Sequence, residues 1–438
     1  MSLPSRTASL ELLPLETLLP IVTSLPGLDT LWNLLRASPH IWRLFNDHAL
    51  FITEGILSGP NSILPHGIAE AVRAVILARS KALPFRNLHE FQVQFLRSVF
   101  PVFKKSDEKE KYITLGPELL SAAAPPVVVL RSVIATAHQI TALSQACLMS
   151  YLERVRDPSF RPLHPVDPKI RYTHGYGPED RRVPAWDRVF DGAPVKVVDA
   201  GQPSWVEEMR VVRALWVIQL VVEVYRQTDA LGWSTEDVKT LSQMSPAELV
   251  DRLDGYLAMR KSEEVRSLMH YLATLGEATQ DTYYRLPRPP PSTRWITASP
   301  NRNEEFLRLL RYNPDGTPFM LPAQTDDYKW GQTEKALARE ALGMKIFRYL
   351  TRQDSFLASP ISGVKFDSFR RLGFAFWDEW RMHLLGMASG IKNRAAAHDA
   401  FYFFAWESIL PPDEVEGLKS ELREKGRIEE QRHNELSQ

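Results

Sequence analysis

The segment from Leu10 to Leu57 reads LELLPLETLLPIVTSLPGLDTLWNLLRASPHIWRLFNDHALFITEGIL. Its apolar residues recur at helical spacing, and prolines and a glycine interrupt the pattern at short intervals. The pattern therefore predicts short helices rather than one long one. We expect them over about residues 14–22, 30–37 and 39–46, with a further helical continuation to Leu57.

Prolines and polar residues mark the expected helix ends. Pro14 fits the first position of a helix, where its missing N–H leaves no bond unmade. After a Leu-Pro-Gly break, Asp29 is expected to cap the second helix by accepting bonds from its free N–H groups. Ser38 and Pro39 repeat this start for the third helix. Pro20, in contrast, falls inside the first helix, where it should remove a hydrogen bond and kink the backbone at about 3 kcal/mol.

The apolar surface of this segment exceeds what the segment can bury alone. Leucine, isoleucine and valine surround most of the first helix, and a unit of about 45 residues cannot cover them all. Each buried leucine contributes roughly 1.5–3 kcal/mol, so the surplus must meet a partner protein or a later part of this chain. The residues concerned are Leu12, Leu13, Leu15, Leu18, Leu19, Ile21 and Val22.

The same residues carry a resemblance to a known family. The F-box motif opens with Leu-Pro-x-Glu-x-Leu and closes on a tryptophan-containing helix. This chain resembles it in Leu13-Pro14-Leu15-Glu16-Thr17-Leu18, Ile21, Leu25-Pro26, Leu28, Leu31 and Trp42-Arg43. The whole chain is similar to filamentous-fungal F-box-like proteins with long helical C-terminal regions. The matching pieces are Leu-Leu-Arg-Ala-Ser-Pro at 34–39, Arg-Ala-Leu-Trp at 213–216 and Gly-Phe-Ala-Phe-Trp-Asp at 373–378.

The resemblance implies a function. F-box proteins dock on the Skp-type adaptor of cullin–RING ubiquitin ligases and recruit a protein substrate with the rest of the chain. We therefore expect a non-catalytic recruiting subunit, with Glu16 capping its helix or staying at the rim of the contact. By motif position, the expected adaptor contacts are Leu13, Pro14, Glu16, Leu18, Ile21, Leu25 and Pro26. The alternative is a helical scaffold protein whose F-box-like helices pack internally and bind no adaptor.

Composition limits the other function classes. Of the 438 residues, 44% are hydrophobic and 24% are charged, which is typical of a globular protein. Lys plus Arg equals Asp plus Glu at 53 each, so no net field favours nucleic acid or an anionic membrane. The single cysteine, Cys147, excludes an internal disulfide and a cysteine-based zinc site.

Localisation follows from what the chain lacks. The first residues show no apolar core of a secretion signal. The apolar run at residues 214–222 is far shorter than the ~20 residues needed to span a bilayer. Low cysteine usage fits a reducing compartment. We expect a cytoplasmic or nuclear protein without a membrane anchor.

The chain as a whole predicts a mainly α protein in three consecutive parts. We expect an F-box-like domain at residues 10–57, a helical domain at 58–285 and a C-terminal helical region at 299–438. Prolines at 286–291 predict an extended segment between the last two, as a stiff linker in preference to a ligand for a proline-recognition module. Eight prolines make residues 157–203 an irregular insert in the second part.

Two long helices stand out in the middle of the chain. One is expected from Val127 to Val155, and the other from Trp205 to Tyr225. Because the second is apolar on most sides, it belongs in a protein interior. We expect its Glu207 and Arg210 to pair at i, i+3 spacing on exposed first turns, without a catalytic role.

Shorter patterns complete the prediction. Ser245 and Glu248 form a capping-box signature at a helix start. Leu337, Ala341, Met344 and Phe347 predict one amphipathic helix. Aromatic clusters at residues 366–387 and 401–406 are expected to be core in preference to a recognition pocket.

Candidate catalytic and metal-binding residues are few. His164, Asp167 and His174 lack the i, i+2 or i, i+4 spacing that sets metal geometry, so we expect no metal and no cofactor. Neighbouring Asp378 and Glu379 point about 100 degrees apart on a helix and form no acid–base pair. Because no hydrolase, nucleotide-triphosphate or dinucleotide motif occurs, an uncharacterised enzyme remains only a third alternative.

Overall fold

The computed structural model describes residues 13–100, 112–166, 192–251, 259–276, 286–291, 294–297, 334–351, 364–388 and 405–436. Within these residues the protein is mainly α, as predicted. The strands described are β1 (Leu163–Pro165) and β2 (Gly192–Pro194), which pair antiparallel with His164 opposite Ala193. They lie in the insert that was predicted to be irregular.

The chain divides into two compact units, each discontinuous in sequence. Unit 1 comprises residues 1–147, 208–300 and 337–339, and unit 2 comprises residues 148–207, 301–336 and 340–438. Helices α7 (Val127–Arg156), α8 (Trp205–Arg226) and α14 (Glu334–Ala338) contribute residues to both. The sequence predicted three consecutive parts instead, and those parts stay a prediction.

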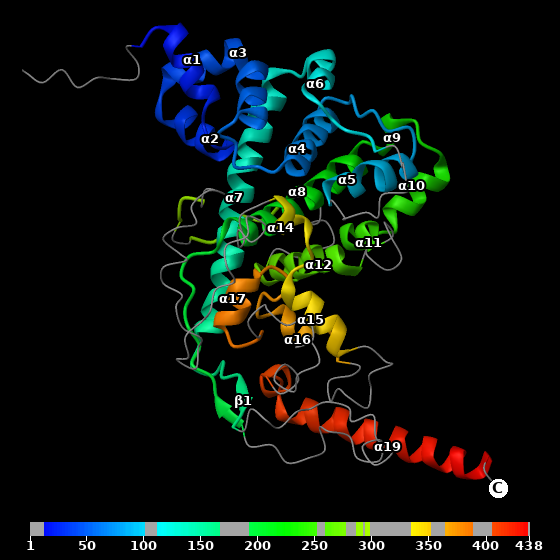
Figure 1. The fold of residues 1–438 in the computed structure, drawn as a ribbon. Helices are drawn as coiled ribbons and strands as arrows, with labels where there is room; N and C mark the ends of the chain where they lie inside the picture. Colours follow the sequence, from blue (N-terminus) through cyan, green and yellow to red (C-terminus); the bar gives the residue numbers. More distant parts are fainter. Residues whose placement is uncertain are drawn as a thin grey trace, which may run out of the picture. The chain divides into compact units, whose positions relative to one another are not determined.

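Unit 1 begins with three helices, drawn in blue in Figure 1: α1 (Leu15–Thr23), α2 (Leu28–Ala37) and α3 (Pro39–Ser58). Ser38 caps α3 as predicted, because its Oγ accepts a 3.3 Å bond from the Ile41 N–H. A break at His48, with φ −128°, divides α3 into the predicted helix and its continuation. We refer to α1, α2 and α3 as the N-terminal three-helix unit.

One expectation about these helices is corrected. Asp29 does not cap α2, because the helix begins at Leu28 and Gly27 occupies the cap position. Burial of the Leu28 side chain in the core extends the helix past the polar residue that local chemistry favours as its start. Helix α1 contains Pro20 in its interior, as predicted, and continues to Thr23.

The C-terminal ends of α1 and α3 contact each other. The Gly55 Cα of α3 faces the Thr23 side chain of α1, and a Cβ added to Gly55 would lie 2.9 Å from it. Further along, the Asn61 amide donates a 3.2 Å bond to the Ser24 carbonyl, and the Ile63 N–H donates one of 3.0 Å to that of Pro26. These contacts join the segments that follow the two helices, so the C-terminal ends of α1 and α3 lie together.

The remaining helices of unit 1 surround α7 and α8. They are α4 (His66–Arg79), the π-helix η2 (Glu90–Leu96), α5 (Arg97–Val99), α6 (Pro117–Ala123), α9 (Thr228–Leu231), α10 (Thr235–Ser242), α11 (Pro246–Asp251) and α12 (Met259–Thr274). The predicted capping box at α11 is confirmed: the Ser245 N–H donates to the Glu248 carboxylate at 2.7 Å, and the Glu248 N–H donates to the Ser245 Oγ at 3.3 Å.

Helix α8 is the interior helix that its sequence predicted. Every residue from Trp205 to Val224 is buried, including the charged ones. Arg213 pairs with Glu264 of α12 at 2.6 Å, and Glu223 pairs with Arg79 of α4 at 2.8 Å. The predicted exposed pair of Glu207 with Arg210 is wrong, because the first turn of α8 lies inside and Glu207 binds another arginine.

Helix α7 is long and apolar enough to cross a membrane, judged by its length and composition alone. The sequence survey missed it and took residues 214–222 as the most apolar run. Half of the apolar window in α7 is buried within the protein. A core helix meets the same criterion, and the side of α7 that carries Val133, Ile140 and Cys147 is buried.

Unit 2 contains β1, β2, α15 (Leu342–Leu350), α16 (Asp367–Arg370), α17 (Glu379–Leu384) and the polar helix α19 (Pro412–Leu436). The first aromatic cluster forms core, as predicted: the Phe369 and Trp406 ring centres are 4.9 Å apart, and both side chains are buried. The single helix predicted around Ala341 is wrong. Ala341 has extended ψ of 139° and caps α15, so it separates α14 from α15.

Some predictions lie outside the described residues. They concern the metal-site candidates Asp167 and His174 and residues 401–404 of the second aromatic cluster.

Candidate functional site

The structure separates the seven predicted adaptor contacts into three groups. Leu18 is fully buried in the core of the N-terminal three-helix unit, next to Val22, so it belongs to the fold and not to a surface. Leu13 and Leu25 are partly buried. The side chains that face solvent are Pro14, Glu16, Ile21 and Pro26, and Ile21 is 41% exposed.

Two exposed apolar residues were not among the predicted contacts. Leu15 in the first turn of α1 is 45% exposed, and Phe51 of α3 is 61% exposed. Phe51 precedes Gly55 by four residues, which places both on one side of α3. Because Gly55 faces Thr23, Phe51 lies on the side of α3 that faces the C-terminal end of α1.

We use the name apolar face for the exposed apolar residues of the three-helix unit, wherever they lie on it: Leu15, Ile21 and Phe51, with the exposed prolines Pro14 and Pro26. Phe51 was missed because the sequence motif ends before it. The sequence pattern that could have identified Phe51 is its four-residue spacing from Gly55, because a glycine within a helix often marks a close contact with another helix.

Polar contacts fasten the three-helix unit to the rest of unit 1. The buried Arg73 of α4 forms an ion pair with Glu54 of α3 and donates a 2.7 Å bond to the Ser58 Oγ. It also donates a 3.2 Å bond to the Leu115 carbonyl. The Arg131 guanidinium of α7 lies 5.1 Å from the centre of the Trp42 ring of α3. The unit therefore has a fixed attachment as well as an exposed face.

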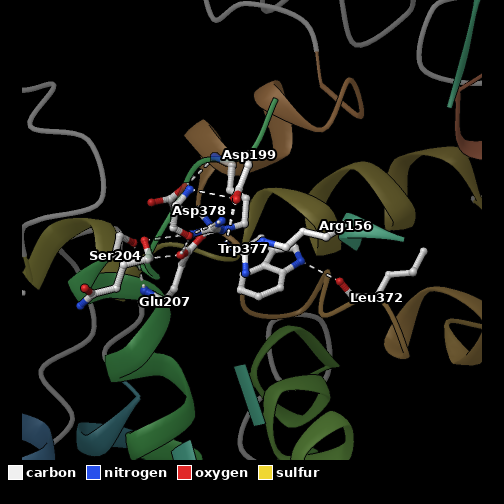
Figure 2. A network of polar contacts seen from close by, with 10 residues as sticks. Arg156, Asp199, Ser204, Glu207, Leu372, Trp377 and Asp378 are labelled. Atoms are coloured by element: carbon white, nitrogen blue, oxygen red, sulfur yellow. Dashed lines mark hydrogen bonds and ion pairs between the residues drawn. The ribbon is translucent and has the colours of Figure 1, made fainter. Parts of the chain in front are cut away.

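A second group of polar residues lies in unit 2 (Figure 2). The Arg381 guanidinium of α17 binds both carboxylate oxygens of Glu207, with distances of 2.9 Å and 3.0 Å. Both side chains are buried. Arg381 also donates to the carbonyls of Gly201 and Gln202, and its guanidinium lies 5.0 Å from the Trp377 ring centre.

Asp378 completes this network. Its carboxylate caps α17 by accepting a 2.8 Å bond from the Arg381 N–H, and its own N–H donates to Glu207 at 3.1 Å. Burial raises the pKa of Glu207, the Arg381 charge opposes this shift, and the nearby Asp378 carboxylate adds to it. Since each charge has a partner, the network fixes the geometry of this region.

A cavity of about 310 Å³ lies beside this network. An Arg156–Asp199 ion pair of 3.0 Å lines it, and both of these side chains are more than one-third exposed. Burial works against the charge of Asp199, but the Gly201 N–H and Arg156 hold the pKa of its carboxyl below the ordinary value. The cavity wall combines charged and apolar side chains. The charged ones are Arg156, Asp157, Arg161, Asp199 and Arg381, and the apolar ones include Leu152, Val155, Phe160, Val195, Val198 and Leu385.

The cavity is suited to binding an apolar side chain, with charged groups beside it. His164, the described member of the metal-site candidates, lies 2.9 Å from the Gly386 carbonyl oxygen through its Nε2. In the part of the chain that the structure describes, no three His, Cys, Asp or Glu residues are placed to hold a metal ion.

Comparison with known proteins adds no relative. No protein-family model matches the chain, and no curated protein and no solved structure matches it. The resemblance in residues 13–43 therefore rests on the motif itself.

Proposed function

We propose that this protein is a substrate-recruiting, non-catalytic F-box subunit of a cullin–RING ubiquitin ligase. In this proposal it binds a Skp-type adaptor through the apolar face of its N-terminal three-helix unit. The observation that supports the proposal is the exposure of Leu15 and Ile21, which lie within the motif-like segment. An adaptor that covers these two side chains would remove their exposed apolar area from water.

The three-helix unit keeps a core of its own beneath that face. Leu18, Leu31 and Phe45 are fully buried. The apolar face is therefore not needed to hold the helices together, and it is free to gain stability on binding. Full burial of a leucine or isoleucine contributes roughly 1.5–3 kcal/mol, so completing the burial of half-exposed side chains contributes about 1 kcal/mol each.

The burial pattern decides how the proposal is tested. A charge at Leu18 would disrupt the core, so loss of adaptor binding in such a variant would not identify a contact. We expect Leu15→Asp/Ile21→Asp to leave the fold intact and to weaken binding by at least 30-fold, because two apolar contacts are replaced by charges that must be desolvated. The measurement is isothermal titration calorimetry of the full chain with a purified Skp-type adaptor.

Ile428→Asp is the matched control. Ile428 of α19 is as exposed as Ile21, at 41%, but belongs to unit 2. This variant should bind the adaptor like the wild type. A well-folded wild-type chain that does not bind, or a double variant that binds normally, would reject the proposal in favour of the helical scaffold.

Recruitment also requires a substrate-binding region, and we place it at the cavity of unit 2. Its wall of mixed apolar and charged side chains, with Arg156 and Asp199 among the charged ones, suits a segment of a protein substrate that presents an apolar side chain beside charged or backbone polar groups. Val198→Trp would fill this space. It should reduce capture of the substrate while leaving adaptor affinity unchanged.

A further inference from the structure

The proline-rich segment that the sequence predicted as a stiff linker is bound by two helices of its own chain. We call residues 286–291 together with 294–297 the docked segment; all of them belong to unit 1. At its start, the Gln139 amide of α7 donates bonds to the Leu286 carbonyl at 2.7 Å and to the Pro287 carbonyl at 2.9 Å. Both of these residues are buried. The segment is therefore held against α7 where the proline run begins.

The end of the docked segment is held by Glu208 in the first turns of α8. The Glu208 carboxylate accepts bonds from the Thr297 Oγ1 at 2.9 Å and from the Trp295 Nε1 at 3.1 Å. The Gln145 amide of α7 donates to the Trp295 carbonyl at 2.8 Å and to the Glu208 carboxylate at 3.4 Å. These donors suit an ionised Glu208, which can only accept.

The side chains that hold the segment are polar, and two of them lie in the interior. Glu208 and Gln145 are each 1% exposed. Replacing buried charged groups by apolar side chains of similar size often stabilises a protein, so a contact that serves stability alone does not need a carboxylate. We call Gln139, Gln145 and Glu208 the segment-binding site. Its chemistry selects a segment by hydrogen bonds.

The bonds define what the site recognises. Three of them go to backbone carbonyls, which an extended proline-rich segment leaves free of internal hydrogen bonds. Prolines also limit the conformational entropy that such a segment loses on binding. The indole N–H and the hydroxyl of a Trp-x-Thr sequence supply the two donors to Glu208. Between them, Ile296 is 90% exposed and its side chain adds little.

The docked segment leaves one group of the site unsatisfied. The Oε1 of Gln145 is buried and makes no hydrogen bond in the part of the chain that the structure describes. A buried acceptor without a donor costs free energy. A segment from another protein that brings a donor to this oxygen would satisfy the site more fully than the docked segment does.

We propose that the segment-binding site takes a proline-rich segment of a partner protein, and that the docked segment occupies the site intramolecularly until the partner displaces it. The partner segment is extended, is rich in proline at its start and carries Trp-x-Thr at its end. Because the docked segment is tethered, it competes at a high effective concentration. The site is therefore autoinhibited. It requires no Skp-type adaptor, so it does not depend on the proposed ligase function.

The test removes the intramolecular competitor from the full chain. In one variant, residues 286–297 are replaced by a glycine–serine linker of equal length. The probe is a fluorescein-labelled peptide with the sequence of these residues, LPRPPPSTRWIT, and its binding is followed by fluorescence anisotropy. The peptide should bind the linker variant at least tenfold more tightly than the wild type, in which the site is occupied.

Changes in the peptide show whether binding uses the contacts seen in the structure. A peptide with Trp295→Phe and Thr297→Val keeps its bulk but lacks both donors to Glu208. It should bind the linker variant at least tenfold more weakly, because the buried carboxylate loses its partners. A peptide with Ile296→Ala is the matched control and should bind like the unchanged peptide, since this side chain is 90% exposed.

A second protein variant covers the case in which the linker variant does not fold. The full chain with Trp295→Phe/Thr297→Val keeps the docked segment but removes its bonds to Glu208, and it should bind the unchanged peptide more tightly than the wild type. Two results would overturn the proposal. One is a peptide that binds neither variant when they are folded, and the other is equal loss of affinity from the Ile296→Ala change and from the loss of both donors.

Discussion

At the scale of single residues, Glu207 and Arg381 show how a buried charge depends on its partner. They lie 174 positions apart, and both side chains are within a few per cent of complete burial. The Arg381 guanidinium makes a two-fold contact with the Glu207 carboxylate and also donates to the Gly201 and Gln202 carbonyls. These bonds satisfy donors that would otherwise be buried without acceptors. Removing one partner is therefore more destabilising than replacing both partners.

A double-mutant cycle measures this asymmetry. Arg381→Met leaves the Glu207 carboxylate buried and unpaired, and should destabilise unit 2 by about 3–5 kcal/mol. Glu207→Gln/Arg381→Met should cost clearly less than the sum of the single changes. Thermal unfolding followed by circular dichroism provides the comparison. Additive effects would mean that the two side chains do not interact in solution.

Glu208 gives stability a dependence on pH with a defined sign. Its pKa in the folded protein, about 7, lies above the ordinary 4.5, so the folded state holds the proton more tightly than the unfolded state. This stabilisation is complete below pH 4.5 and is lost as the pH rises to about 7, which amounts to about 3 kcal/mol. Melting temperatures of the wild type should decline over this range more steeply than those of Glu208→Gln. Parallel profiles would contradict this assignment.

At the scale of elements, α1 carries two kinds of leucine that sequence alone does not distinguish. Leu18 is enclosed by the three-helix unit, whereas Leu15 is exposed. Leu18→Ala should cost about 2–5 kcal/mol, through lost burial and the cavity left behind. Leu15→Ala should cost less than about 1 kcal/mol. The melting temperatures of the two variants measure the difference, and equal losses would show that α1 is packed differently.

The turn after α16 requires a glycine for two reasons. Gly373 has φ +76°, and a Cβ at this position would lie 2.8 Å from the Trp377 ring and 2.9 Å from Tyr151. Gly276, at the end of α12, has φ +81° but open space around it. Gly373→Ala should therefore destabilise the protein by about 2–5 kcal/mol, from backbone strain together with overpacking.

Gly276→Ala is the control for backbone strain alone and should cost only about 1–2 kcal/mol. Urea unfolding followed separately for the two units would give both values. If Gly373→Ala were no more destabilising than Gly276→Ala, the Trp377 ring would have to move away from the added Cβ at little cost in free energy.

At the scale of the whole molecule, the three-helix unit is part of unit 1 and not a detachable module. Arg73 is buried and depends on Glu54 and Ser58, and Arg131 covers Trp42. Deleting residues 1–57 removes Glu54 and Trp42, so it leaves the Arg73 guanidinium with fewer acceptors and uncovers apolar surface of α4 and α7. A truncated chain is therefore a poor control for adaptor binding.

We expect the chain without residues 1–57 to aggregate or to melt at a markedly lower temperature. The surface variant Leu15→Asp/Ile21→Asp should remain monodisperse and melt like the wild type. Size-exclusion chromatography with differential scanning fluorimetry distinguishes the two outcomes. A stable, monodisperse truncated chain would show that the attachment to α4 and α7 contributes little.

The sequence by itself determined the helical class, the bounds of α7 and α8 within one or two residues, the Ser38 cap and the Ser245 capping box. These features depend on bonds and side-chain spacing within a few positions, so local chemistry decides them. Only the tertiary structure decided that Glu207 pairs with Arg381, that Glu208 holds residues 294–297, and that Leu18 is core while Leu15 and Phe51 face solvent. These outcomes depend on which distant segment packs against a given helix face. The residue spacing along one helix does not specify that segment.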